Sequence, residues 1–389
     1  MLRSVAQSWL DTLRSIAQDT GVWMLLVLAP VVYAFFYPWP YAEQAVTRVP
    51  VAVVDLDHSS LSRQITRFAM ANPRMDVRWI GGDVREAQEA LWRGEIEGFA
   101  ILPANLKRNV VRGTPAVVTV EGDGAFALLN KAVLYGFAEA VGTVSAGIEI
   151  KKLRAAGQGA VQAAASRSPV NVQLVPLFNP TEGYGSYVVP AVAILIIQQT
   201  LLMGVAMLVG TWVERGEHRA QATVWLGRLL AFASLGFLSG LFYIGWVFVW
   251  QDYPRGGNPF VAVGMLGVYA LAVSALGALL GLWFKDRERS LQVLLLTALP
   301  MAFLSGFSWP VEALPDVLQV LRWLIPSTSA IQASLLLNQM GAPLAAVAFP
   351  LLVLAGMALS LGLWVVMAGR PRPGAAAGVP MGRTGSGER

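Results

Sequence analysis

The run SYVVPAVAILIIQQTLLMGVAMLVGTWV, Ser186 to Val213, contains no charged side chain. A helix that spans a bilayer needs about 20 such residues in succession. Further hydrophobic runs occur at Gly21–Tyr37, Trp225–Trp250, Phe260–Phe284, Ser290–Gly306 and Ala345–Ala368. The composition agrees, since 55% of residues are apolar, 14% are charged and the mean hydropathy is +0.55. The sequence therefore predicts a polytopic α-helical membrane protein with about six transmembrane helices.

The first hydrophobic run, Gly21–Tyr37, is 17 residues long and stands at the short end for a spanning helix. A cleaved signal peptide is the competing interpretation. The run is followed by YPWPY, which is rich in interfacial aromatic residues and offers no small-residue cleavage site. We therefore interpret residues 21–37 as an uncleaved transmembrane helix 1.

Residues 38–185 form an insert with the composition of a soluble protein. VAVVD (Val51–Asp55) predicts a strand, and Ser59 or Ser60 can cap a helix with an apolar face of Leu61, Ile65, Phe68 and Ala69. Further strand-like and helix-like segments alternate, with Asp83 as a helix cap, so the insert predicts a compact α/β domain between helices 1 and 2. A long helix over 125–157, a linker over 160–168 and a last strand over 170–176 complete it.

The N-terminal residues 1–20 have the spacing of an amphipathic helix, with apolar side chains on one face and charged side chains on the other. One interpretation is an anchor on the membrane surface, and the other is a docking surface for a cytoplasmic partner. The apolar positions are Leu2, Val5, Ala6, Trp9, Leu10, Leu13, Ile16 and Ala17, and the charged ones are Arg3, Asp11, Arg14 and Asp19.

Lysine and arginine residues outside the insert indicate the orientation. In a six-span arrangement twelve of these fourteen residues fall on one side, and only Arg255 and Arg322 fall on the other. Because basic residues are retained in the cytoplasm, both termini are predicted to be cytoplasmic in a bacterial inner membrane, with residues 369–389 as a disordered tail. The insert then faces outward, and its fifteen basic and fourteen acidic residues leave no basic face for nucleic acid.

The segment 305–329, SGFSWPVEALPDVLQVLRWLIPSTS, is broken by Pro310, Pro315 and Pro326. Irregular backbone at membrane depth is tolerated where protein or a water-filled cavity satisfies its polar groups. We therefore expect short re-entrant or interfacial helices on the outer side, with Trp309 and Trp323 at headgroup level. An ordinary outer loop is the alternative. Within this segment Ser305, Phe307 and Trp309 are candidates for an outer gate.

Several chemical functions are excluded by what the sequence lacks. Cysteine is absent, and His58 and His218 have no ligand spacing around them, so we expect neither a metal site nor catalytic residues. Asp55 and Asp57 near His58 favour turn and cap chemistry rather than catalysis. No Gly-Lys pair occurs, so the chain lacks a phosphate-binding P-loop, and any ATP hydrolysis must take place on another polypeptide.

The predicted spans contain few charges but several uncharged polar residues. Such side chains can line a translocation path, or they can join helices by hydrogen bonds, and both interpretations stay open. The absence of intramembrane acids argues against a proton-coupled carrier. The path candidates are Gln198, Gln199, Thr200, Gln292 and Thr297.

Five blocks of sequence stand out in order along the chain: VAVVDLDHSSLSRQ (51–64), GEIEGFAILPANLKRNVVRGTPAVVTVEGD (94–123), LFNPTEGYGSYVVPAVAILIIQQT (177–200), FLSGFSWPVEALP (303–315) and LIPSTSAIQA (324–333). These blocks resemble the permease subunits of ABC-2 type exporters. The individual blocks are of modest specificity, whereas their order and spacing extend over nearly the whole chain. The resemblance implies one half of a transporter that pairs with a second permease, as a homodimer or heterodimer, and with ATPase subunits that bind ATP and Mg²⁺.

In this family the N-terminal helix and the loop between spans 2 and 3 meet the ATPases. The corresponding segments are 1–20 and 214–225, although the loop here reads ERGEHRAQATVW where many relatives carry an acidic-basic run ending in Gly-Thr. The implied contact residues are Trp9, Arg14, Glu214, Arg215, Glu217 and His218.

The predicted function is therefore export of an apolar or amphipathic substrate, such as a drug-like compound or a lipid, without enzymatic activity in this chain. The outer domain is a candidate for docking a periplasmic adaptor, and membrane lipid surrounds the spans. A membrane-anchored sensor or scaffold is the alternative. An intramembrane enzyme is disfavoured, because no nucleophile and base pair is visible.

Overall fold

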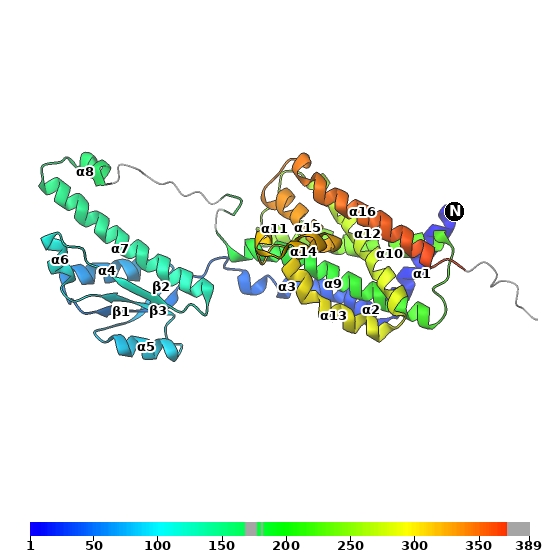
Figure 1. The fold of residues 1–389 in the computed structure, drawn as a ribbon, viewed down its shortest axis with the longest axis horizontal. Helices are drawn as coiled ribbons and strands as arrows, with labels where there is room; N and C mark the ends of the chain where they lie inside the picture. Colours follow the sequence, from blue (N-terminus) through cyan, green and yellow to red (C-terminus); the bar gives the residue numbers. More distant parts are fainter. Residues whose placement is uncertain (168–176, 180–181, 372–389) are drawn as a thin grey trace, which may run out of the picture. The chain divides into compact units, whose positions relative to one another are not determined.

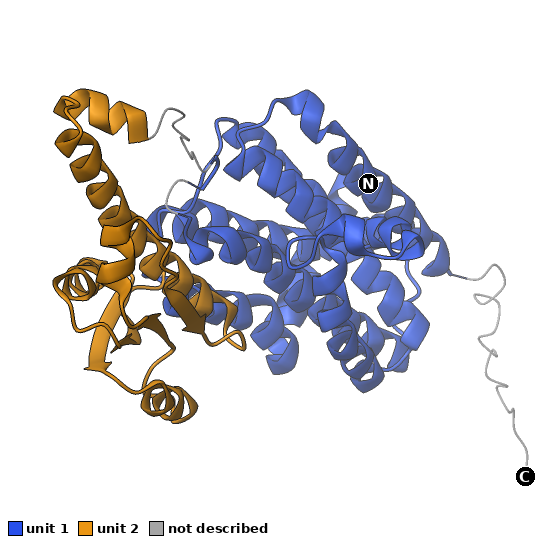
Figure 2. Ribbon diagram, turned by 60° about the vertical axis from the view of Figure 1, so that its left-hand side comes forward, with its two compact units in different colours: residues 1–44, 176–389 blue, residues 45–175 orange. Residues whose placement is uncertain are grey.

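The structure is a computed structural model that describes residues 1–167, 177–179 and 182–371. It consists of two compact units, shown in different colours in Figure 2. Unit 1 comprises Met1–Gln44 and Pro176–Arg389, and unit 2 comprises Ala45–Val175. Unit 2 thus begins later and ends earlier than the predicted insert, residues 38–185. It begins later because the aromatic segment after the first span belongs to unit 1. The predicted strand over 170–176 and the tail beyond residue 371 lie outside the described residues.

Unit 1 is entirely helical in its described part (Figure 1). Its first helices are α1 (Leu2–Gln18), α2 (Thr20–Trp23), η1 (Met24–Leu28), α3 (Ala29–Phe36) and η2 (Trp39–Tyr41). The long helices are α9 (Tyr184–Glu214), α10 (Ala222–Leu241) continued by η3 (Phe242–Val247) and α11 (Phe248–Trp250), α12 (Pro259–Phe284), α13 (Arg287–Leu304) and α16 (Leu344–Ala368). Shorter ones are η4 (Val311–Ala313), α14 (Asp316–Leu321), η5 (Arg322–Leu324), α15 (Pro326–Ser334) and η6 (Leu335–Gln339).

Six helices of the described residues are long and apolar enough to cross a membrane, and five of these, all in unit 1, coincide with predicted spans. The sixth, α7 (Ala127–Ala155), belongs to unit 2, where Val133 and Phe137 are fully buried in the core beside the sheet. Helix α13 is long enough to be counted among these helices but too polar, because its first turn contains Arg287, Glu288 and Arg289. We assign α13 as the remaining span, since its next residues are apolar and it packs on α9.

Helix α9 forms the centre of unit 1, and 78% of its most apolar window is buried. Helices α12 and α13 are its main neighbours. Two glycines on α12 allow close approach: a Cβ at Gly277 would lie 3.1 Å from the Leu202 carbonyl oxygen, and one at Gly281 would lie 2.7 Å from that of Ala206. Small residues at such contacts are the usual means of packing helices inside a bilayer.

The proline-broken segment folds into short helices. The stretches Asp316–Leu324 and Pro326–Gln339 meet at a bend of 91°, a geometry found in broken spans and re-entrant loops. Pro326 is the first residue of α15, where a missing backbone N–H costs nothing. Trp323 packs edge-on against Phe349 of α16, at 4.8 Å between ring centroids, whereas Trp309 is exposed.

Unit 2 carries a four-stranded sheet of order β2-β1-β3-β4. In chain order its elements are β1 (Val49–Asp55), α4 (Ser60–Ala71), β2 (Met75–Gly81), α5 (Val84–Trp92), β3 (Gly98–Leu102), α6 (Leu106–Arg112), β4 (Thr119–Gly122), α7 and α8 (Ala160–Arg167). Strands β1, β2 and β3 are parallel, and β4 is antiparallel to β3. Helices α4 and α7 cover one face of the sheet and α5 covers the other (Figure 1). The alternation of strands and helices follows the order that the sequence predicts.

Two local predictions differ from the structure. Residues 160–167, expected as a linker, form α8, because their alanines have the highest helix propensity. Phe68 is 41% exposed, and Ser62 and Thr66 share the buried face of α4 with Leu61 and Ile65. Helix caps are as expected, since Ser59 accepts from the backbone N–H of Leu61 and Asp83 accepts from that of Arg85.

Candidate functional site of the helical unit

Helix α1 lies against the first turns of α10, and it does so through small polar residues. Ser8, Thr12 and Ile16 are its buried residues, while Leu2 and Leu10 are exposed. The Ser8 hydroxyl donates to the Val224 carbonyl at 2.8 Å. Leu2 and Leu10, which were predicted on the apolar face, therefore do not pack against another helix of this chain, because α1 contacts α10 through only a narrow stripe of its surface.

This contact depends on Gly227, which lets the two helices approach. A Cβ at Gly227 would lie 2.5 Å from the Val5 carbonyl oxygen and 2.7 Å from Ser8 Cβ. Real Cβ contacts essentially never come so close, so any larger residue would push α1 away from α10.

Asp19, at the corner between α1 and α2, links this end of the chain to α13. Its carboxylate accepts from Arg287, with Nη2–Oδ1 at 2.8 Å, and also caps α2 through the Val22 N–H at 3.1 Å. The hydrogen bonds with Arg287 lower the pKa of Asp19 below its ordinary value. Arg287 further donates to the Thr211 hydroxyl, and its backbone N–H donates to Glu214 at 2.7 Å. We call Asp19, Thr211, Glu214 and Arg287 the Arg287 cluster.

The loop between α9 and α10, residues 215–221, is fixed at both sides. The Ala220 N–H donates to the Gly369 carbonyl at 2.9 Å, and Arg219 donates to the Arg370 carbonyl at 3.0 Å. The Arg228 guanidinium lies over the Trp212 ring at 4.1 Å and the Trp225 ring at 4.9 Å, and it donates to the Glu217 carbonyl. The start of α10 and the end of α16 therefore hold this loop in place.

The contact residues implied by the resemblance lie on these segments. Trp9 is half-buried on α1, and Arg14 is exposed in an ion pair with Asp11. Glu214, Arg215 and Glu217 are exposed around the end of α9. His218 is half-buried, and burial together with the neighbouring Arg219 cation lowers its pKa. The structure thus brings all six predicted positions to one end of unit 1.

Asp19 and Arg287 were not among the predicted site residues, although they join the two predicted segments. The available signal was local: Asp19 precedes the first hydrophobic run, and the sequence KDRER directly precedes the fifth. Nothing in the spacing of two residues 268 positions apart indicates that they pair.

A second group of polar side chains lies inside the bundle. Gln198 is fully buried on α9, and its Oε1 accepts from the Ser327 backbone N–H at 2.7 Å. Gln198 and Gln199 both approach Met301 Sδ, at 3.3 and 3.9 Å. The first turn of α15 therefore receives its capping acceptor from α9.

Several hydroxyls on α12 and α15, which pack against α9 and against each other, have no hydrogen-bond partner within the described part of the chain. Ser327, Thr328 and Ser329 on α15 are fully buried, as is Ser274 on α12. We call these four residues and Gln199, whose Oε1 is also unpaired, the hydroxyl cluster. Buried polar groups are normally paired, so these unpaired atoms set the interior of unit 1 apart.

The other predicted path residues do not join it. Thr200 donates back to the Ile196 carbonyl of its own helix, as Thr297 does to Leu294. Gln292 is exposed on α13. The structure therefore buries Gln198, half-buries Gln199 and adds α15, which starts in the segment predicted to form short re-entrant or interfacial helices.

The three gate candidates also separate. Ser305 is fully buried, and its carbonyl accepts from Gln332 at 3.3 Å. The Phe307 carbonyl accepts from the Tyr187 hydroxyl of α9. Trp309 is 54% exposed and lies apart from these contacts. Ser305 and Phe307 thus fix the end of α13 to α9 and α15.

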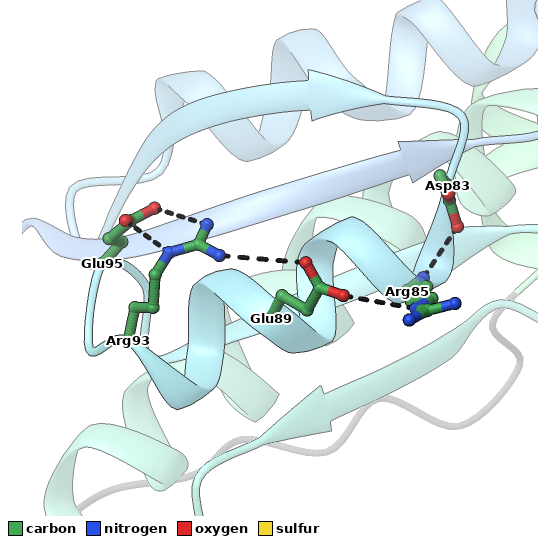
Figure 3. A network of polar contacts seen from close by, with 5 residues as sticks. All are labelled: Asp83, Arg85, Glu89, Arg93 and Glu95. Carbon is green, nitrogen blue, oxygen red and sulfur yellow. Dashed lines mark hydrogen bonds and ion pairs between the residues drawn. The ribbon is translucent and has the colours of Figure 1, made fainter.

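Unit 2 offers polar networks of a different kind. The Asp55 carboxylate is buried and accepts from the N–H groups of Asp57 and His58 and from the Ser62 hydroxyl, which is turn and cap chemistry as predicted. Figure 3 shows a chain of contacts along α5, in which Arg85 and Arg93 pair with Glu89, and Arg93 also pairs with Glu95. These side chains are exposed, so their pairing contributes little. No group of metal-ligating side chains occurs among the described residues.

A bundle of helices long and apolar enough to span a membrane, interrupted in sequence by a sheet-bearing unit, defines a multi-pass membrane protein. The family model for ABC-2 family transporter proteins matches residues 20–366. The chain belongs to this family.

Curated relatives agree with the assignment. The chain is 21% identical over 324 residues to the probable multidrug ABC transporter permease YbhS of Escherichia coli strain K12, covering 81% of this chain and 82% of the relative. The protein of the same name from Escherichia coli O157:H7 matches with the same figures.

Proposed function

We propose that this chain is the permease subunit of an ATP-driven exporter for an apolar or amphipathic substrate. The observation that supports it best is the convergence of α1, the loop 215–221, the start of α13 and the end of α16 at one end of unit 1. Membership of an ABC transporter family implies an ABC ATPase as partner. This end, with Arg215, Arg219, Lys285 and Arg289, is the cytoplasmic surface where that ATPase binds.

Movement of the ATPase reaches the bundle through the Arg287 cluster. Because Arg287 contacts the α1–α2 corner and the end of α9, displacement of α1 is transmitted to α9 and α13 together. Helix α9 in turn carries Gln198, which holds the first turn of α15. The transporter consists of two permease copies, or of one permease and a similar partner, and the substrate passes between them beside the hydroxyl cluster. Because lipid surrounds the spans, an apolar or amphipathic molecule suits this path.

The orientation is tested by labelling single cysteines, for which the natural absence of cysteine provides a clean background. Glu217→Cys reports on the loop 215–221, and Trp92→Cys reports on unit 2, where Trp92 is 79% exposed. A membrane-impermeant maleimide should label Trp92→Cys in cells with a permeabilised outer membrane. Glu217→Cys should react only after the inner membrane is opened. Labelling of Glu217→Cys before that step would overturn the orientation.

ATPase docking is tested with the same variant in the complex that co-purifies with the chain. The ATPase should protect Glu217→Cys from the maleimide and leave Trp92→Cys reactive. Transport is measured as ATP-dependent accumulation of a fluorescent amphiphile in inside-out vesicles. ATPase protection without any such accumulation across a panel of amphiphiles would favour a sensor or scaffold over an exporter.

Coupling is tested at Gly227. Gly227→Leu separates α1 from α10 and should reduce ATP-dependent accumulation, whereas Gly264→Leu on α12, where a Cβ meets nothing within 4 Å, should leave it near the parent level. Equal transport by both variants would show that the α1–α10 contact does not transmit the motion.

A further inference from the structure

Unit 2 contains a cavity of about 440 Å³ between α4, α6 and α7. Its floor is apolar: Leu61 and Ile65 come from α4, Leu106 from α6 and Val144 from α7. All four side chains are at least nine-tenths buried. The volume falls within the range of roughly 300–1,000 Å³ that is usual for small-molecule sites.

The segment 113–118 explains why the cavity exists. It joins α6 to β4 without helix or strand structure, starting at Gly113 with φ of +77°. Ala116 and Val118 of this segment are half-buried and line the cavity, whereas Val117 between them is 73% exposed. An irregular linker thus covers the gap between α6 and α7 less completely than a strand or helix would. The floor residues are buried and the other lining residues are half-buried or exposed, so the cavity opens to the surface above an apolar floor that suits an apolar chain.

The rim of the cavity is polar on the side of α7. Ser145, Glu149 and Lys152 line it, and Lys152 Nζ donates to the Val110 carbonyl of α6 at 3.1 Å. An ammonium group has three donors, so two remain for a ligand at the mouth.

The elements that bound the cavity carry six cations, on α6 and the last turns of α7, and none of them forms an ion pair within the described residues. Lys152 lines the cavity together with the acid Glu149, whereas Lys107, Arg108 and Arg112 line a separate hollow beside Leu56 and Asp57. The cations are Lys107, Arg108, Arg112, Lys151, Lys152 and Arg154. A cation with free donors at the mouth of an apolar cavity complements a molecule with an apolar chain and an anionic group.

We propose that this cavity is a binding site for an anionic amphiphile. The apolar chain lies between α4, α6 and α7, and the carboxylate, sulfate or phosphate group accepts hydrogen bonds from Lys152. The site goes beyond the proposed export function, because it lies within unit 2 and its occupancy is measured by binding, without ATP or transport.

The test uses the full chain in nanodiscs of zwitterionic lipid. The probes are palmitic acid with a diazirine in its chain, the alkyl phosphate of the same chain, and the matched alcohol. After photolysis, labelled peptides of unit 2 are identified by mass spectrometry. The acid or the phosphate should label the peptides that contain residues 106–118 and 141–152. Which of the two labels more strongly distinguishes a free carboxylate ligand from a phosphate-bearing lipid.

Matched variants separate the two parts of the site. Ala116→Trp fills the cavity and should remove most of the labelling, and the adjacent exposed Val117→Trp should not. Lys152→Gln should lower labelling by the acid about threefold, as expected for a partly exposed charge contact, whereas Lys151→Gln, which does not line the cavity, should have little effect. Val141→Phe fills the cavity from α7 and replaces Ala116→Trp if that variant does not fold.

Two results would overturn the proposal. Labelling of unit 2 that persists in both filled variants would show that the cavity is not the site. Equal labelling by the alcohol and by both anionic probes would remove the role assigned to Lys152.

Discussion

The two units differ in the buried polar side chains that they leave without a hydrogen-bond partner. In unit 2, Asp55 and Ser62 are buried and bonded to each other and to nearby backbone groups, so their polarity serves the fold. In unit 1, the four hydroxyls and the Gln199 Oε1 of the hydroxyl cluster have no hydrogen-bond partner in the described part of the chain. Of all the described buried side-chain atoms without a partner, only Gln158 Oε1 belongs to unit 2.

This difference points to where function lies. A domain in water gains nothing from an unpaired buried hydroxyl, because the lost hydrogen bonds to solvent cost about 1–3 kcal/mol. A bundle in lipid has few other donors and acceptors for a passing molecule, so unpaired groups in its interior can serve as contacts. If the comparison is right, substitutions in unit 2 will change stability, and substitutions in the hydroxyl cluster will change transport.

The largest effect is expected for Asp55→Ala. It removes the acceptor of three hydrogen bonds at a residue that is 6% exposed. Leaving these donors unpaired should destabilise unit 2 by about 3 kcal/mol. Hydrogen–deuterium exchange followed by mass spectrometry should show faster exchange in β1 and α4. Helices α9 and α12 of unit 1 should exchange as before, and a parallel loss of their protection would contradict the separation of the units.

Arg287→Ala should come next, at about 2–3 kcal/mol. It leaves the Asp19 carboxylate without its side-chain partner, whereas the backbone N–H that donates to Glu214 remains, and the Arg287 and Asp19 side chains are only 28% and 20% exposed. Thermal unfolding of the detergent-solubilised chain measures the loss. Arg14→Ala, which breaks an exposed pair with Asp11, serves as the control and should cost less than about 0.5 kcal/mol.

The pH dependence checks the assignment to Asp19. Because Arg287 lowers the pKa of Asp19 in the folded chain, the stabilising contribution is fully present above the ordinary value of 3.8 and is lost as the pH falls through the lowered value. The parent and Asp19→Asn should therefore differ in stability at neutral pH and converge in acid. A constant difference down to low pH would assign the effect to another group.

The sequence predicted most of the fold because its signals are local. Long apolar runs marked α9, α12 and α16, and the β-branched run at Val51–Asp55 marked the buried strand β1. Caps were predicted at Ser59 and Asp83 because each acts within three residues of itself. The prediction that Phe68 belongs to the buried face of α4 was wrong, because a surface position can hold an apolar side chain without penalty. Periodicity alone therefore does not define the buried face.

The candidate site was predicted only in part, because it depends on contacts between distant residues. Gln198 was found as a polar residue in a span, yet its partner Ser327 lies in a segment that proline and serine marked as irregular. Gln292 has the same character as Gln198 in the sequence but lies on the exposed side of α13. Which face of an apolar helix is buried is decided by its neighbours, and a run that is apolar all round carries no such signal.

Ser62→Ala tests the paired half of the comparison. Ser62 is fully buried, and its hydroxyl donates to Asp55 Oδ2 at 2.7 Å and accepts from the Ser59 N–H at 3.0 Å. Its removal should cost about 1–2 kcal/mol. Exchange rates in α4 measure the loss, and Ser145→Ala on the exposed rim of α7 is the control. A cost indistinguishable from that control would show that the network is redundant.

Ser329→Ala tests the unpaired half, and its effect on stability should be the smallest of all. Ser329 is as completely buried as Ser62, but its hydroxyl has no partner in the described chain. Removing it breaks no bond, so the free energy of unfolding should change by less than about 0.5 kcal/mol. ATP-dependent accumulation in vesicles should nevertheless fall about threefold to tenfold, the effect of one hydrogen bond to the substrate. Ser360→Ala on the exposed face of α16 should alter neither quantity. Because Ser62 and Ser329 lose the same atom at the same burial, a stability loss in Ser329→Ala equal to that of Ser62→Ala would assign the hydroxyl cluster to folding rather than transport.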